Sequence, residues 1–342
     1  MQVASLCAAN QLATCSMKQF SWHSGNLSDY RFLVTGGAGF IGSHLVEYLL
    51  KHGAKEVRVL DNLVTGFLEN INAFSGETNF TFLNGSITDP AQCKKACEGI
   101  DFVLHQAALG SVPRSIDNPP ATHEVNATGF LNMLMAARDA NVKKFVYASS
   151  SSVYGDNTDS PKKEERIGRA LSPYAVTKAL NEQYALVFSQ VYGMTTVGLR
   201  YFNIFGPRQN PKGEYAAAIP LFIEGLLKGT PVYINGDGEQ SRDFTFVANA
   251  VQANIRALFA DDEKVKGQVF NIAAGHSISV KRVYEILKDA IGSSQEAIHR
   301  DPRKGEIRDS LADVSKANAA FGYAPEIGVE EGLKKTLDWF RE

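Results

Sequence analysis

The chain has 342 residues, more than the roughly 150 residues of one ordinary domain, so two domains are expected. A hydrophobic share of 44% and a charged share of 21% are typical of a globular protein and exclude disorder, collagen-like repeats and a disulfide scaffold. A formal charge of −2 does not favour binding to nucleic acid, so no nucleic acid partner is expected. No apolar run reaches the roughly 20 residues of a membrane helix, so no membrane association is expected.

The N-terminal segment, residues 1–30, lacks the basic-then-apolar layout of a secretion signal. We expect an extension there, with a helix docked on the main body as one form that it could take. The chain has four cysteines, which favours a reducing compartment, and we expect a cytoplasmic protein. Cys93 and Cys97 lie one helical turn apart without a second ligand pair; structural packing is favoured, zinc is the alternative, and no metal is expected in the site.

From Arg31 onward, short apolar segments alternate with helical patterns. Strands are predicted at 31–36, 56–62, 79–85, 101–108, 144–150 and 195–203, and helices at 40–53, 91–99, 121–140 and 173–192. Strand–helix–strand units form right-handed crossovers, and nearly continuous apolar strands are covered on both faces. The pattern therefore predicts an α/β fold with a doubly wound parallel sheet.

This alternation ends after Asn203. Residues 204–220 are rich in Gly, Pro and polar side chains, which predicts a loop. A short helix at 220–229 and a strand at 232–236 follow, while 244–260 and a strand at 268–273 are expected to return to the main sheet. We therefore expect a large domain from 31–202 plus 243–274 and a smaller α/β domain from 203–242 plus 275–342.

A glycine-rich motif, TGGAGFIG, follows the first strand and opens the first helix. Gly36 permits the tight turn, Gly39 lets the backbone approach a pyrophosphate, and Gly42 lets helix and strand pack closely. The helix N-terminus offers unpaired N–H groups to the phosphates. Asp61 ends the next strand, where a carboxylate binds the ribose hydroxyls and repels a 2′-phosphate, which favours NAD over NADP. A plain structural turn and a loop-capping Asp are the alternatives.

A second motif, YAVTK, places Tyr174 and Lys178 four residues apart on one face of a helix. A free tyrosine, with a pKa of about 10, is a poor base at neutral pH. A nearby ammonium and an oxidised nicotinamide both favour tyrosinate; lowering the pKa by about three units takes about 4 kcal/mol, which two cations in a partly dry site can supply. Either residue could instead be surface decoration.

Four serines, 149–152, end the predicted strand at 144–150. Ligands of open α/β sheets bind at the carboxyl ends of the strands, so a hydroxyl there can relay the proton of a substrate alcohol toward Tyr174. A plain polar loop is the alternative.

Together these motifs resemble the extended short-chain dehydrogenases/reductases from Arg31 onward. Further stretches narrow the resemblance to nucleotide-sugar 4-epimerases, above all the UDP-N-acetylglucosamine 4-epimerase group: HQAALGSVPRS, GLRYFNIFGPRQ, YINGDGEQSRDF and GEIRDSLAD. The resemblance implies that the large domain is a Rossmann domain that binds NAD and that the smaller one binds a nucleotide sugar.

The resemblance also implies residue roles: Tyr174 is the base, Lys178 its electrostatic partner and ribose ligand, and Ser150 the relaying hydroxyl. The implied cofactor contacts are Gly36, Gly39, Phe40, Ile41, Gly42, Asp61, Asn62, Ser86, Ile87, Gln106, Ala107, Ala108, Tyr174 and Lys178. The implied substrate contacts are Gly110 and Ser111 in the sugar pocket, Ser150, Ser151 and Ser152 near the sugar or the cofactor amide, Asn203 and Arg242 at the pyrophosphate, Arg308 as a second cation, and Tyr233 against the nucleotide.

Two positions bear on specificity. Relatives carry an Asp where this chain has Ser86, so we expect weaker adenine recognition but not loss of the cofactor. In the resemblance, Ser310 occupies the position that gates the pocket near the sugar C2 substituent. A small serine leaves room for an N-acetyl group, with an ordinary polar loop residue as the alternative.

The implied reaction is NAD-dependent 4-epimerisation of a UDP-hexose through a transient 4-keto sugar. UDP-GlcNAc/UDP-GalNAc is the favoured pair, and UDP-Glc/UDP-Gal a further one. Sugar 4,6-dehydratases carry Asp-Glu where Ser151 and Ser152 stand here, and decarboxylating relatives use a Glu beside the tyrosine, so both are disfavoured.

Two alternatives stay open. UDP-glucuronate 4-epimerases share ASSSSVYG and need a site for a sugar carboxylate. A non-catalytic NAD-binding scaffold with the same fold is disfavoured, because Tyr174, Lys178 and Ser150 are all present.

The helices at 121–140 and 173–192 have larger apolar faces than are needed to cover the sheet. In relatives the corresponding helices form a four-helix interface, so we expect a homodimer.

Overall fold

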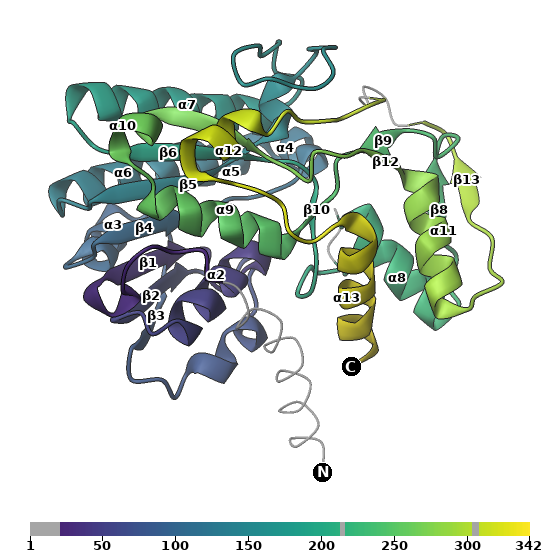
Figure 1. Ribbon diagram of the computed structural model, residues 1–342, viewed down its shortest axis with the longest axis horizontal. Helices are drawn as coiled ribbons and strands as arrows, with labels where there is room; N and C mark the ends of the chain where they lie inside the picture. Colours follow the sequence, from purple (N-terminus) through teal and green to yellow (C-terminus); the bar gives the residue numbers. More distant parts are fainter. Residues whose placement is uncertain (1–20, 213–215, 303–307) are drawn as a thin grey trace.

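The computed structural model describes residues 21–212, 216–302 and 308–342, and its main feature is a seven-stranded parallel sheet (Figure 1). The strands follow one another in the order β11-β6-β5-β4-β1-β2-β3. This confirms the predicted doubly wound parallel α/β sheet. Their bounds are β1 Arg31–Thr35, β2 Glu56–Asp61, β3 Phe80–Asn84, β4 Phe102–His105, β5 Lys144–Ser150, β6 Thr196–Tyr201 and β11 Gln268–Ile272.

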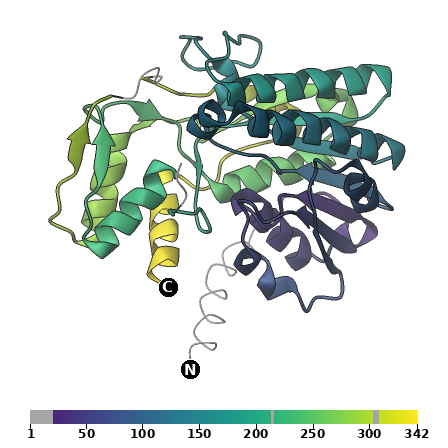
Figure 2. The same cartoon turned by 180° about the vertical axis from the view of Figure 1, so that it is seen from behind.

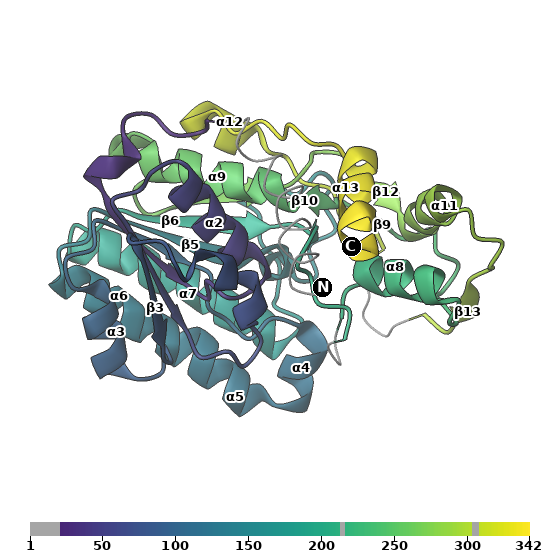
Figure 3. The ribbon, with the colours of Figure 1, turned by 90° about the horizontal axis from the view of Figure 1, so that it is seen from below.

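Helices cover both faces of the sheet, as Figure 3 shows. On one face lie α2 (Phe40–Lys51) and α9 (Val247–Phe259); on the other lie α3 (Pro90–Cys97), α6 (Gly129–Asp139) and α7 (Pro173–Val191). The buried apolar side chains accordingly form two large clusters, one on each face of the sheet. Because both faces are covered, the strands are almost continuously apolar.

Two of the helices that cover the sheet begin at a side-chain cap. Asp89 accepts backbone N–H bonds at the start of α3 and is followed by Pro90, and Ser172 does the same for α7, followed by Pro173. Cys93 is buried within the α3 packing, where its thiol donates to the Ile87 carbonyl oxygen at 3.2 Å.

The predicted helix at 121–140 differs in detail. The observed run begins earlier and has three parts: α5 (Pro119–His123), a π-helical turn (Glu124–Thr128) and α6. A separate short helix, α4 (Val112–Asp117), precedes it. We missed α4 because six residues are too few to display a helical period; the local signals are a Ser111 cap and Pro113.

A further group of elements gathers at one side of the sheet, at the right of Figure 1 and the left of Figure 2. They are α8 (Ala218–Lys228), α11 (Val280–Ile291), α13 (Val329–Arg341) and three strand pairs: β8 (Tyr233–Asn235) with β13 (Ile298–Arg300), β9 (Ser241–Arg242) with β12 (Ile278–Ser279), and β7 (Ile204–Phe205) with β10 (Thr245–Phe246). The predicted domain boundaries stay a prediction, and α12 (Ser315–Phe321) packs against β11 of the main sheet.

Of the expected N-terminal extension, residues 1–20 lie outside the described residues, and so does the expectation of a docked helix there. Residues 21–30 pack against the main body: the Trp22 ring stacks on Tyr48 of α2 with centroids 5.2 Å apart, and Leu27 is buried. Among the described residues, no helix is both long and apolar enough to cross a membrane.

Candidate active site

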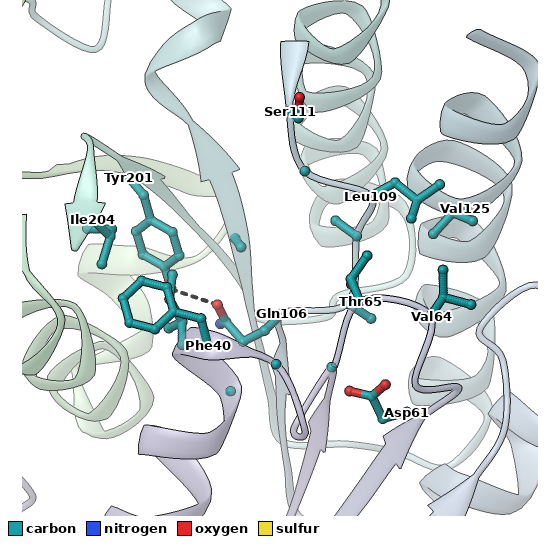
Figure 4. Close-up of a pocket in the computed structure, with 18 of the residues that line it drawn as sticks. Phe40, Asp61, Val64, Thr65, Gln106, Leu109, Ser111, Val125, Tyr201 and Ile204 are labelled. Atoms are coloured by element: carbon teal, nitrogen blue, oxygen red, sulfur yellow. Dashed lines mark hydrogen bonds between the residues drawn. The ribbon is translucent and has the colours of Figure 1, made fainter. Parts of the chain in front are cut away.

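A cavity of about 690 Å³ opens at the carboxyl ends of five parallel strands (Figure 4). Gly36 follows β1, Asp61 ends β2, Gln106 follows β4, Ser150 ends β5 and Tyr201 ends β6, and all five line the cavity. The order of the strands reverses between β1 and β4, and ligands of open α/β sheets bind at such a reversal. The sheet topology therefore brings residues from distant parts of the sequence into one site.

The glycine-rich turn forms the floor of the cavity beside β1. Gly36 has a φ of 68°, and a Cβ there would lie 2.7 Å from the Ala107 nitrogen. A Cβ on Gly42 would lie 2.1 Å from the Gly36 oxygen, so α2 can approach the turn only because residue 42 is a glycine. Gly39 is the N-cap of α2 and provides no side-chain cap, so first-turn N–H groups of α2 lack a capping side chain at the cavity.

Asp61 is held rigidly at the end of β2. Its Oδ2 accepts the Ala38 N–H at 3.0 Å and its Oδ1 accepts the Leu63 N–H at 2.8 Å. Burial raises the pKa of Asp61, and these two hydrogen bonds oppose that rise. Each carboxylate oxygen has a second lone pair, so the group can accept further hydrogen bonds from a ligand.

Tyr174 and Lys178 project from α7 into the same cavity. Lys178 Nζ donates to the Ala148 carbonyl oxygen at 2.7 Å and lies 5.8 Å from the centroid of the Tyr174 ring. Burial raises the pKa of Tyr174, while its hydrogen bond with Ser150 lowers it. Burial also lowers the pKa of Lys178 to about 8. The pair is thus a partly buried phenol and a buried ammonium that face one cavity.

The sequence analysis missed several residues that line the cavity. One of them, Tyr201, donates from its hydroxyl to Gln106 Oε1 at 3.1 Å, the dashed line in Figure 4, and accepts from Asn254 Nδ2 at 2.7 Å. The signal that could have found Tyr201 is its position at the end of a strand, next to the predicted Asn203. The other missed lining residues include Val64, Thr65, Phe67, Leu109, Arg114, Val125, Gln209, Asn210, Ala216 and Ala217.

Most of the predicted cofactor residues lie together. The predicted residues that line the cavity are Gly36, Gly39, Phe40, Ile41, Gly42, Asp61, Asn62, Ile87, Gln106, Ala107, Ala108, Gly110, Ser111, Ser150, Tyr174, Lys178 and Asn203. Ser86 does not line it; its hydroxyl bonds to Thr88 Oγ1 at 2.8 Å. Ser151 and Ser152 lie beside the cavity in a 3₁₀ turn, Ser151–Tyr154, and the buried Ser152 hydroxyl has no partner among the described residues.

A second group of predicted residues lies outside the cavity lining. Arg242 Nη1 donates to the Arg308 carbonyl oxygen at 3.0 Å, and the Ser310 N–H donates to the Ser241 carbonyl oxygen at 3.2 Å. These contacts place the segment of Arg308 and Ser310 alongside β9, which contains Arg242. Tyr233, on β8, is 41% exposed.

Comparison with known proteins decides the family. The model of the NAD dependent epimerase/dehydratase family matches residues 32–273, which is more than half of the chain. The chain belongs to this family. It is therefore an enzyme of the extended short-chain dehydrogenase/reductase type, as the motifs predicted, and its cofactor is NAD.

Three relatives of this family member show the range of its neighbours. The chain is 40% identical to the UDP-N-acetylglucosamine 4-epimerase of Methanobrevibacter ruminantium M1, solved with UDP-N-acetylmuramic acid (TM-score 0.85; 91% of this chain, 98% of that one). It is 38% identical to the UDP-glucose 4-epimerase of Thermus thermophilus, solved with NAD (TM-score 0.82; 91% and 99%). It is 35% identical to the UDP-glucuronate 4-epimerase of Thermodesulfobacterium geofontis (91% and 96%).

The residues present fit NAD. The uncapped N-terminus of α2 offers N–H groups and a positive dipole end to a pyrophosphate, and the glycine turn before it lines the cavity. Asp61 is a fixed acceptor at the end of β2, where a ribose hydroxyl needs one and a 2′-phosphate would be repelled.

Proposed function

We propose that this family member is a UDP-hexose 4-epimerase that interconverts UDP-GlcNAc and UDP-GalNAc, and more slowly UDP-Glc and UDP-Gal. One observation carries the proposal: Tyr174, Lys178 and Ser150 line the same cavity as Asp61 and the uncapped start of α2. The 40% identity to a UDP-N-acetylglucosamine 4-epimerase supports the choice of substrate. The described cavity has no acidic pair beside Tyr174 that would eliminate water, since Ser151 and Ser152 occupy those positions.

Each residue has a defined task. Bound NAD supplies a hydride acceptor, and afterwards a donor, at C4 of the sugar. Tyr174 removes the proton from O4 and later returns it, with Ser150 as the relay. Lys178, with a pKa of about 8, is mostly protonated at pH 7, and its charge opposes the cost of forming a buried phenolate.

The substrate must be anchored at one end and free at the other. Asn203, Arg242 and Arg308 hold the pyrophosphate, because guanidinium groups match phosphate oxygens in charge and geometry. Tyr233 packs against the nucleotide. The 4-keto sugar then turns about the pyrophosphate and presents its other face, so binding energy at the UDP end supports chemistry at C4.

The sugar end of the site is small and polar. Gly110 and Ser111 line the sugar pocket, and Ser111 is fixed as the N-cap of α4. Ser310 leaves room for an N-acetyl group at C2. These three positions set the preference for the acetylated sugar.

The second candidate is UDP-glucuronate 4-epimerisation. Arg114 lines the cavity near Gly110 and Ser111, and a guanidinium there is suited to a sugar carboxylate. The relative from Thermodesulfobacterium geofontis supports this reading.

We also propose a homodimer formed through α6 and α7. Large apolar side chains on these two helices are exposed in the single chain, and exposed apolar patches mark association surfaces. They are Met135, Val176, Leu186, Val187 and Val191. Light scattering across micromolar concentrations should give twice the chain mass; the mass of one chain throughout would contradict the dimer.

The test of the function uses purified protein without added NAD. Incubation with UDP-GlcNAc, UDP-Glc and UDP-GlcA in parallel should yield UDP-GalNAc fastest, because the cofactor stays bound and is regenerated at each turnover. Preferred turnover of UDP-GlcA would select the second candidate. Protein that carries NAD yet converts none of the three would instead be a non-catalytic scaffold.

A further inference from the structure

Helix α7 meets the end of β5 through three contacts. Residues spaced four apart on α7 lie on one face of the helix, and each contacts one of three consecutive residues of β5. The pairs are Tyr174 with Ser150, Lys178 with Ala148, and Glu182 with Ser149. The first two pairs belong to the proposed catalytic site. The third pair differs: Ser149 lines the cavity but Glu182 does not, and nothing in the proposed chemistry requires Glu182.

The third contact is the centre of a buried polar network. Glu182 Oε1 accepts from Ser149 Oγ at 2.5 Å and from Arg200 Nε at 2.8 Å, while Oε2 accepts from Arg200 Nη2 at 2.8 Å. Ser149 on β5 and Arg200 on β6 are cross-strand neighbours. The side chains of Glu182 and Arg200 are 8% and 3% exposed. One carboxylate therefore fixes α7 against two adjacent strands, directly behind Lys178.

The charge of Glu182 also acts on Lys178. Burial destabilises the ammonium of Lys178, and the carboxylate of Glu182 is the charged group that opposes this effect among the described residues. On β4, His105 faces Lys178 from the other side and is neutral, since burial lowers its pKa to about 3. The other titratable groups around the network are Arg200 on β6, Tyr147 on β5, Tyr154 after β5, Glu164 in the following loop and Lys316 on α12.

We propose that Glu182 is a positioning residue of the Tyr174–Lys178 site, with two effects. It sets the register of α7 against β5, so that the phenol meets Ser150, and it supplies the negative charge that keeps the buried ammonium of Lys178 protonated. The proposal rests on the proposed function only for its kinetic readout.

Glu182→Gln tests the charge, because the amide keeps the shape and one acceptor. At high pH, deprotonation of Lys178 removes the charge that faces the phenolate, so turnover should fall there. In the variant this alkaline fall should begin about one pH unit lower, the size expected of a carboxylate close by in a partly dry site. Ser149→Ala tests the register: it keeps the carboxylate, so turnover should fall severalfold while the alkaline limb stays where it is.

A second measurement does not depend on turnover. NMR of protein labelled at the lysine Cε, with the Lys178 signal assigned through Lys178→Arg, follows the protonation of this side chain directly. Its pKa should be lower in Glu182→Gln than in the wild type. If Glu182→Gln fails to fold, Glu182→Gln/Arg200→Gln removes both charges at once, which costs less than leaving one buried charge alone. A lowering is still expected, but a smaller one, because loss of the Arg200 charge acts on Lys178 in the opposite direction.

Two control variants separate this effect from simple loss of packing. Ser189→Ala removes another hydroxyl contact between α7 and β6, the Ser189–Thr196 bond of 2.7 Å, farther along the helix. Glu47→Gln breaks a second buried ion pair, between Glu47 on α2 and Arg208. Both should lower stability without moving the protonation of Lys178.

The outcomes are distinguishable. A lowered Lys178 pKa in Glu182→Gln, in protein that epimerises none of the substrates, would reject the proposed function and keep the role of Glu182. An active enzyme in which Glu182→Gln changes neither the Lys178 protonation nor the alkaline limb would overturn the inference. A shift of equal size in Glu47→Gln would also overturn it.

Discussion

The two ends of the proposed site are built differently. The NAD end is formed by residues at the carboxyl ends of parallel strands, and most of the residues predicted there line one cavity. The nucleotide end uses Tyr233, Arg242 and Arg308, which lie on two short strands and in a neighbouring loop outside the cavity lining. We conclude that changes at the first end should affect chemistry and cofactor retention, and changes at the second should affect substrate binding alone.

The largest effect is expected at the first end. Tyr174→Phe should lower turnover by at least about 10³-fold, because it removes the only group that exchanges the O4 proton in the proposed reaction. UDP binding, measured by calorimetry, should change little. Tyr192→Phe, at the end of the same helix, is the matched control and should keep full activity. Near-normal turnover by Tyr174→Phe would mean that the base is another residue.

The second prediction concerns the nucleotide end. Arg242→Met keeps the aliphatic stem but loses the charge, so it should weaken UDP binding about 10- to 100-fold, as expected for losing charge-assisted hydrogen bonds to phosphate. The amount of NAD that co-purifies should stay the same. Arg282→Met, on the exposed side of α11, is the control. Loss of NAD in Arg242→Met would contradict the proposal that changes at the nucleotide end leave cofactor retention unchanged.

His44 links α2 to the loop that follows Asn203. On α2, its Nε2 lies 3.0 Å from the carbonyl oxygen of Pro207, in the loop that follows Asn203. Burial lowers the pKa of His44 to about 3, below its ordinary value of 6.5. Between these values the unfolded chain binds the proton and the folded chain does not, so the free energy of unfolding falls as the pH falls below 6.5.

The pH effect can be isolated by difference. At pH 5 the His44 contribution corresponds to about 2 kcal/mol. Urea unfolding of the wild type and His44→Gln at pH 7 and pH 5 should show the variant losing less stability on acidification. His105 also lowers the free energy of unfolding as the pH falls, because burial lowers its pKa. Asp243 acts in the opposite direction, because burial raises its pKa to about 6. Both residues are present in the wild type and in the variant, so their contributions cancel in the difference. Equal pH dependence of the two proteins would contradict the prediction.

The smallest expected effect is one of selectivity. Ser310→Tyr fills the space beside the sugar C2 substituent, so turnover of UDP-GlcNAc should fall about 10-fold more than turnover of UDP-Glc, within the range that pocket size alone provides. Steady-state rates on both substrates measure this ratio. Equal losses on both would reject Ser310 as a gate.

The sequence predicted the features that are local. The glycine turn, Asp61 and the Tyr174–Lys178 pair each depend on one strand, one turn or one helix, so their spacing in the chain is sufficient. The doubly wound parallel sheet follows from the regular alternation of strands and helices, whereas the order of its strands was not predicted.

Features that depend on the register between distant segments could not be predicted. Glu182 meets Ser149 and Arg200 only because β5 and β6 pair with these two residues side by side. Tyr201 and Gln106 meet across separate strands in the same way. The position of Ser86 after β3 could be predicted. Its hydrogen bond to Thr88 and its place outside the cavity lining could not.

The most direct test of the account follows the hydrogen at C4. Protein purified without added NAD is incubated with UDP-GlcNAc that carries deuterium at C4, and the product is analysed by NMR and mass spectrometry. The account predicts UDP-GalNAc with the deuterium still at C4, because the same hydride leaves and returns within one active site. Product that has exchanged this deuterium for solvent hydrogen, or no product from protein that holds NAD, would contradict it.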